Sequence, residues 1–77
     1  MKFIIKHEMK GRMRVRLSQK RMTYEQADIL QYYLLCNESV KLAKVYDRTC
    51  DAVINYTGDR EDVIRLLQEF HYQTVEV

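Results

Sequence analysis

One short segment near the start of the chain alternates strictly between arginine and apolar side chains. In Arg12–Leu17, with the sequence RMRVRL, residues 12, 14 and 16 are arginine, and the residues that follow them are methionine, valine and leucine. A repeat of two is the signature of a β-strand that buries one face and exposes the other. Such a strand needs partner strands and a layer that covers its apolar face, so the remaining sequence has to supply both.

The chain length of 77 residues fits one domain, residues 1–77, with a single small core. An apolar content of 47% and a charged content of 31% are typical of a globular protein. The net charge of +2 is too small to indicate a nucleic-acid partner by itself. The apolar runs are far shorter than the roughly 18 residues of a membrane span. The apolar run near the N-terminus is also too short for the core of a signal peptide. We therefore expect a cytoplasmic domain that does not insert into a membrane.

Two helices are predicted from capping signals and apolar stripes. Thr23 and Gln26 form a capping-box pattern that opens a helix reaching to about Cys36. Asp59 is a predicted N-cap, and the acidic residues that follow it favour the positive end of a helix dipole. The inner stripes, spaced as one helical face requires, are Ala27, Leu30 and Leu34 in the first helix and Val63, Leu66, Leu67 and Phe70 in the second.

The remaining periodic segments are predicted strands. Residues 2–6 are also extended in character, so the first strand is expected to run through 2–6 and 12–17 with a break near Gly11. Residues 40–45 form a second strand with a bulge, 52–57 form a third that Gly58 ends, and 72–77 form a fourth. The resulting order βαββαβ predicts an α+β, ferredoxin-like fold, in which a four-stranded antiparallel sheet has both helices on one face.

The sheet face opposite the helices is the first candidate site. Arg14, Arg16, Lys44, Asn55 and Tyr72 are expected there, on the face where RNA-binding modules of this fold stack bases on aromatic side chains of the two central strands. The outward positions of those strands hold no aromatic residue. We therefore expect no nucleic-acid partner, and an RNA-binding or other protein-interaction module is the alternative function.

Soft metal ligands are present, but their spacing does not form a recognisable site. His7, Met9 and Met13 could bind Cu(I) only if they shared one strand face, which a bulge at Gly11 would prevent. A surface histidine and core methionines are the preferred interpretation. We expect no bound metal or cofactor. The remaining candidate ligands for Cu(I) or Zn(II) are Cys50, His7 and Met22.

The two cysteines lack the spacing of a metal site or a redox motif. Cys36 is expected to pack at the end of the first helix, and Cys50 is expected in a turn. The predicted topology puts them at opposite ends of the sheet, about 20 Å apart along the helix, too far for a disulfide or a shared metal. We expect two free thiols in a reducing compartment.

No nucleophile and base, and no pair of carboxylates, occur at a spacing that indicates catalysis. Acylphosphatases share the predicted element order and use an arginine and an asparagine, which Arg12 or Arg21 and Asn55 could imitate. The glycine-rich phosphate loop of those enzymes is missing here. The domain is therefore predicted to be non-catalytic.

Four segments of the sequence form a recognisable series: Gly11–Leu17, the pattern Val40-x-x-Ala43-x-Val45, Asp47–Ala52 and Tyr56–Arg60. Taken in this order, they resemble the heavy-metal-associated domain, in the divergent version found at the N-terminus of bacterial heavy-metal-translocating P-type ATPases. The resemblance covers nearly the whole chain.

The resemblance implies a cytoplasmic domain at the inner face of the cell membrane, with a regulatory, docking or scaffolding role in or beside a metal pump. The partner would be the rest of that ATPase or another protein, and ATP hydrolysis would belong to the parent pump. In the better-known branch of the family, a Met-x-Cys-x-x-Cys loop after the first strand binds a soft metal. Here the corresponding residues 18–23 have no cysteine, and Lys20 and Arg21 would repel a cation. The resemblance therefore implies a domain that is degenerate at the metal loop.

Overall fold

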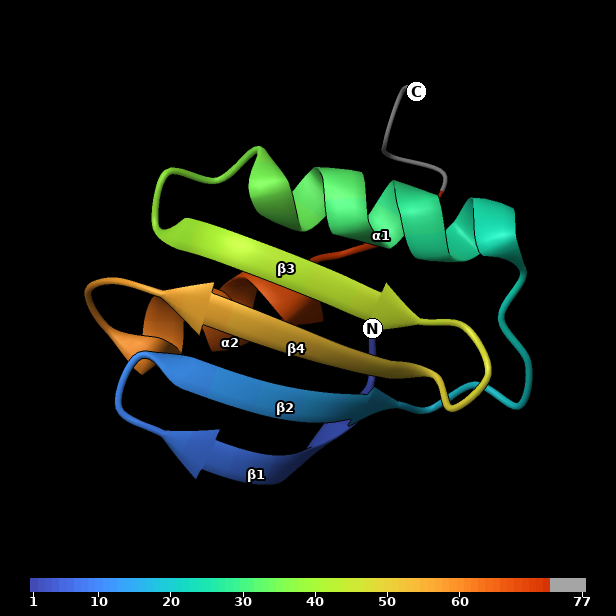
Figure 1. Ribbon diagram of the computed structural model, residues 1–77, viewed down its shortest axis with the longest axis horizontal. Coiled ribbons are helices and arrows are strands. Elements are labelled where there is room, and N and C mark those ends of the chain that lie inside the picture. Colours follow the sequence, from blue (N-terminus) through green and yellow to red (C-terminus); the bar gives the residue numbers. More distant parts are fainter. Residues whose placement is uncertain (73–77) are drawn as a thin grey trace.

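The computed structural model describes residues 1–72, which form one four-stranded antiparallel sheet and two helices (Figure 1). The predicted α+β, ferredoxin-like class is confirmed. The sheet order is β1-β2-β4-β3, and Figure 1 looks onto its open face, with α2 behind the sheet and α1 along the β3 side. The elements are β1 (Phe3–Met9), β2 (Arg12–Leu17), α1 (Tyr24–Leu35), β3 (Val40–Tyr46), β4 (Asp51–Tyr56) and α2 (Arg60–Gln68).

Residues 3–17 form a hairpin where the sequence indicated one interrupted strand. β1 runs antiparallel to β2, and Lys10 and Gly11 make the reversal between them. Gly11 has a φ of +79°, a conformation that side chains other than glycine rarely adopt, and its carbonyl accepts a 2.9 Å hydrogen bond from the Tyr56 amide. The break predicted near Gly11 is therefore a complete change of direction. The described element order is ββαββα.

β1 occupies the edge of the sheet next to β2. The sequence assigned a fourth strand to residues 72–77 instead. Of that segment, residues 73–77 lie outside the described residues, and the Tyr72 ring packs edge-on against Phe70 at a centroid distance of 4.9 Å. The fourth strand of the described sheet is thus contributed by the N-terminus.

The strand registers contain two irregularities. One lies between Val40 and Leu42 in β3, where the spacing of apolar residues predicted a bulge. The other lies between Ile5 and His7 in β1, which the sequence did not indicate. Each bulge shifts the following residues by one position relative to the partner strand, so both decide which side chains reach the open face.

The core lies between the sheet and the two helices. The predicted capping box is present: the Thr23 hydroxyl accepts from the Gln26 amide, and the Gln26 side chain accepts from the Thr23 amide. Asp59 is the N-cap residue of α2, as predicted, but its side chain makes no capping hydrogen bond. Leu66 is only partly buried, although it was placed in the inner stripe. Side chains with no measurable exposure are Met13, Val15, Leu30, Leu34, Ala52, Ile54, Leu67 and Phe70.

Within residues 1–72, no helix has the length and apolar character needed to cross a membrane.

Candidate functional site

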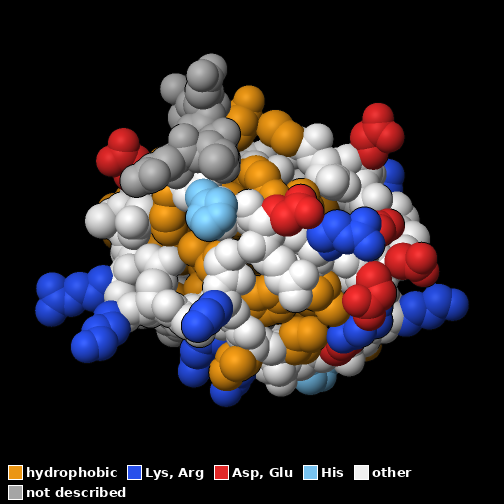
Figure 2. All heavy atoms as spheres, turned by 180° about the vertical axis from the view of Figure 1, so that it is seen from behind, with side chains coloured by type: hydrophobic (Ala, Val, Ile, Leu, Met, Phe, Trp, Pro, Cys, Tyr) orange, Lys and Arg blue, Asp and Glu red, His pale blue; other side chains and the backbone are white. Residues whose placement is uncertain are grey.

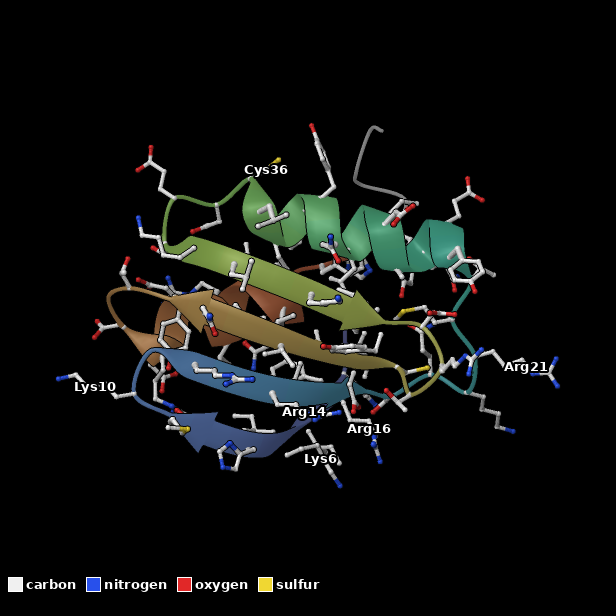
Figure 3. All side chains as sticks on the ribbon, viewed as in Figure 1. Lys6, Lys10, Arg14, Arg16, Arg21 and Cys36 are labelled. Atoms are coloured by element: carbon white, nitrogen blue, oxygen red, sulfur yellow. The ribbon has the colours of Figure 1, made fainter. Side chains whose placement is uncertain are left out.

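The open face of the sheet brings together side chains from all four strands. Residues directly opposite one another in an antiparallel sheet point to the same side, so the registers define this face without ambiguity. Figure 3 shows Arg14 and Arg16 on it. The side chains of the open face are Ile4, His7 and Met9 from β1, Arg12, Arg14 and Arg16 from β2, Asp51, Val53 and Asn55 from β4, and Leu42, Lys44 and Tyr46 from β3.

A buried carboxylate organises one end of this face. Asp51 is only 1% exposed, because the side chains of Arg14 and Arg16 lie over it while remaining about half exposed themselves, at 48% and 45%. Arg16 donates from Nε to Asp51 Oδ1 at 2.8 Å, and Arg14 donates from Nη2 to Oδ2 at 2.9 Å. The hydrogen bond from Arg16 is the largest influence on the pKa of Asp51, and with Arg14 it holds that pKa below its ordinary value despite the opposing effect of burial.

The charge of the face is predominantly positive. Arg12 and Lys44 are exposed. Arg12 lies two residues before Arg14 in β2, and Lys44 pairs in register with Val53, two residues after Asp51. The Lys44 Nζ atom lies 5.7 Å from the centroid of the Tyr46 ring. Among the open-face residues, Asp51 is the one carboxylate, and two arginines already neutralise it. The chain as a whole has 13 basic and 11 acidic residues, so this excess of cations is a local feature of the face. Acidic side chains are visible on the helix-covered side (Figure 2).

Exposed apolar side chains flank these cations. They lie on β1 and β3, the two outer strands of the sheet, and not on the central pair. Four large apolar residues of the open face are substantially exposed: Ile4 (55%), Met9 (57%), Leu42 (56%) and Tyr46 (41%).

Four of the five residues predicted for this face are found there. Arg14, Arg16, Lys44 and Asn55 lie on it, whereas Tyr72 does not, because its hydroxyl donates to Gln19 Oε1 at 2.6 Å beside the helix-side core. Sequence reasoning did not assign six other members to this face: Ile4, His7, Met9, Leu42, Tyr46 and Asp51. Tyr46 was detectable from the alternation of β3, whereas Asp51 lay outside the predicted strand 52–57 although it is the first residue of β4.

The loop at residues 18–23, between β2 and α1, is held by hydrogen bonds from the side chain of one glutamine. The Gln19 side chain donates from Nε2 to the Arg21 carbonyl at 2.6 Å and accepts from the Tyr72 hydroxyl. Met22 is buried, at 8% exposed, whereas Lys20 and Arg21 point to solvent. Figure 3 shows Arg21 projecting away from the sheet. The loop thus presents cationic side chains outward.

The candidate metal ligands are not gathered in one place. Cys50 and Met22 both belong to the buried core cluster. His7 is exposed on the open face, on the other side of the sheet, where it lies opposite Arg14 in the strand register. Of the other predicted soft ligands, Met9 shares the face of His7 and Met13 is buried behind it. Among residues 1–72, no group of three histidine, cysteine, aspartate or glutamate side chains is close enough to hold a metal ion.

The two thiols are free, as predicted. The C-terminal end of α1, which carries Cys36, and the turn between β3 and β4, which holds Cys50, lie at opposite ends of the molecule (Figure 1). Cys36 caps the C-terminal end of α1 and is exposed, so its predicted packing is wrong: the helix turns its last residue away from the core. Cys50 is buried in the turn before β4, where it adopts a positive φ of 57°.

Of the two arginines that were compared with the acylphosphatase arginine, one lies beside Asn55 and the other does not. Arg12 is the register partner of Asn55 on the open face, while Arg21 lies in the loop before α1. The Asn55 Oδ1 atom is buried and accepts no hydrogen bond within the described residues.

Searches against protein-family models, curated proteins and solved structures find no match to this chain. Its function therefore has to be argued from its own residues.

Proposed function

We propose that this chain is a non-catalytic docking domain of a heavy-metal-translocating P-type ATPase, and that it docks through the open face of its sheet. The observation that supports docking is the face itself: a layer of exposed cationic and apolar side chains, organised by the Arg14–Asp51–Arg16 cluster, that no described element covers. The link to a metal pump rests on the resemblance of four sequence segments to the family.

The segments that resemble the family fall on the elements that frame this face. Gly11–Leu17 corresponds to the turn and β2, Val40–Val45 lies in β3, and Asp47–Ala52 leads into β4. The proposal treats the metal loop as degenerate, because the residues between β2 and α1 offer Lys20 and Arg21 to solvent and no thiol. Docking, and not metal transfer, is then the role left for the domain.

The gene that encodes the chain tests the assignment to a pump. If the proposal is right, the reading frame continues beyond Val77 into several apolar segments of about 20 residues, or a neighbouring gene encodes such a protein. A frame that closes after this domain, with no ion pump encoded nearby, would overturn the pump assignment.

Binding to the pump can be measured separately. The chain, mixed with the membrane-embedded remainder of the pump in detergent, is expected to form a complex that the double variant Arg12→Gln/Lys44→Gln weakens. A complex that is equally strong with this variant would place the docking surface elsewhere on the molecule.

A further inference from the structure

The open face combines fixed cations with protruding apolar side chains. Arg14 and Arg16 each use Nε and Nη2 to bind Asp51, which leaves Nη1 of both guanidinium groups without a hydrogen bond among residues 1–72. Their positions are therefore set before any partner arrives. Arg12 and Lys44 extend the positive charge across β2 and β3.

The apolar side chains of the face are separated from one another by these cations. Ile4 and Met9 lie near the two ends of β1, and Leu42 and Tyr46 lie near the two ends of β3, with the charged strand β2 and strand β4 between the pairs. A protein–protein interface usually has the opposite plan, with an apolar centre and a polar rim. The arrangement fits a partner that offers apolar and anionic groups everywhere along its surface.

The shape of the face also limits the partner. Four hollows of the described surface are lined by residues of the hairpin turn and the α2 start, with Met9 among them, of the N-terminal segment near Phe70, and of the helices. None of these four gives an extended acidic peptide a groove beside Arg14 and Arg16. A single strand of RNA would find one aromatic ring, Tyr46, on an outer strand, in place of a stacking platform on the central strands.

We propose that the open face binds the surface of an anionic lipid bilayer. The guanidinium and ammonium groups meet lipid phosphates, and Ile4, Met9, Leu42 and Tyr46 enter the boundary between headgroups and acyl chains. Binding is peripheral, because no described helix could span the bilayer. This inference rests on the docking role proposed above, in which the open face meets the membrane-embedded part of a pump, and adds that the same face also meets the anionic lipid beside it.

Vesicle sedimentation with the full chain tests the proposal. The chain is expected to sediment with vesicles of equal parts phosphatidylglycerol and phosphatidylcholine and to stay in solution with vesicles of phosphatidylcholine alone. Added salt should weaken binding, since it screens the attraction. Equal binding to both vesicles, or binding to neither, would refute the proposal.

Two matched double variants locate the surface. Arg12→Gln/Lys44→Gln removes two open-face cations that do not touch Asp51, and should weaken binding roughly 25-fold, at about fivefold for each charge. Arg21→Gln/Arg65→Gln removes the same charge from the loop and from α2, and should change binding less than about twofold. Equal losses in both variants would show that only net charge matters and would refute the face assignment.

The apolar contribution has its own variant. Ile4→Ser/Leu42→Ser keeps every charge and should weaken binding to the anionic vesicles even in high salt, where the electrostatic part is screened. Circular dichroism of each variant verifies that the fold is retained. Unchanged binding would show that no side chain enters the bilayer.

The outcomes separate this inference from the proposed function. Failure to bind vesicles, with a reading frame that continues into a pump, removes the lipid partner and leaves the docking role. Tighter binding to soluble polyglutamate or to an RNA oligonucleotide than to the anionic vesicles would also refute a lipid partner, in favour of an acidic protein or a nucleic acid.

Discussion

At the scale of single residues, Asp51 has the largest effect on how the open face is arranged. It lies at the start of β4 opposite Arg16, and its carboxylate is bound by two arginines that lie two residues apart on the same face of β2 and would otherwise repel each other. Removing the carboxylate leaves two neighbouring cations without a counter-charge. The geometry of the face therefore depends on one buried acid.

Asp51→Asn is expected to lower the free energy of unfolding at neutral pH by about 1 to 2 kcal/mol. This estimate lies around the lower end of the range of about 1.5 to 3 kcal/mol for hydrogen bonds to charged groups, because both arginines are half exposed and screened by solvent. Urea denaturation of the two proteins measures the difference. Val53→Thr, on the same face, is the control and should change the free energy by less than about 0.5 kcal/mol.

The pH dependence follows from the lowered pKa of Asp51 in the folded state. A carboxyl whose folded pKa lies below its unfolded value stabilises the fold above the unfolded pKa, near 3.8, and loses this contribution as the pH falls through the folded pKa. The stability difference between wild type and Asp51→Asn should stay constant from neutral pH down to the unfolded pKa and shrink below it. A difference that shrinks well above that point would contradict the ion-pair cluster.

The two thiols should differ in reactivity towards a water-soluble thiol reagent. Cys36 is exposed and should react at once in the native protein, whereas Cys50 is 5% exposed and should react on the order of 100-fold more slowly, through local opening. Both should react in denaturant. Mass spectrometry after a timed pulse of reagent identifies the modified residue. A second thiol that reacts as fast as the first would show that the turn before β4 is open.

At the scale of secondary-structure elements, the N-terminal hairpin is the feature that differs most from expectation. β1 hydrogen-bonds along the free side of β2, and Glu8 binds Arg60 at the start of α2, with 3.0 Å between Glu8 Oε1 and Arg60 Nη2. The hydrogen bond from Arg60 lowers the pKa of Glu8. This contact ties the edge strand to the second helix and lets β1 add Ile4, His7 and Met9 to the open face.

The two helices allow a matched test of burial. Leu67 of α2 has no exposure, and Leu67→Ala should lower the free energy of unfolding by roughly 2 to 5 kcal/mol, the usual cost of a cavity in a core. Leu35→Ala makes the same chemical change at the end of α1, where the side chain is 45% exposed, and should cost less than about 0.5 kcal/mol. Urea melts of both variants provide the comparison, and similar losses would show that a helical face is misassigned.

At the scale of the whole molecule, the distribution of charge and aromatic rings distinguishes this sheet from that of an RNA-binding module. The described aromatic residues other than Tyr46 do not belong to the open face. The Phe70 ring, for example, packs beside the helices against Tyr33 at a centroid distance of 4.7 Å and against Tyr72 at 4.9 Å. The open face is left with cations as its main binding groups.

The chain is therefore expected to bind single-stranded RNA only weakly at physiological salt. Base stacking on aromatic side chains normally adds about 1 to 3 kcal/mol per base, and the central strands offer no ring for it. Fluorescence polarisation with labelled oligonucleotides of differing sequence measures this. Sub-micromolar binding that depends on sequence would replace the docking proposal with an RNA-binding function.

The sequence by itself determined the features that depend on neighbouring residues. Alternation in Arg12–Leu17 predicted both the buried and the open side of β2, the Thr23 capping box predicted the start of α1, and the stripe through Leu67 predicted the buried face of α2. Each of these is local, because period, capping and helical spacing act over a few residues. The α+β class followed from their order.

The tertiary structure decided what depends on pairing between distant segments. The reversal at Gly11 placed β1 at the sheet edge, and the register of β2 with β4 put Asp51 beneath two arginines 35 and 37 residues away in sequence. No short-range pattern encodes either contact, since a one-residue change of register would turn Asp51 to the other face of the sheet. The open face, and with it the candidate site, exists only once those strands have paired.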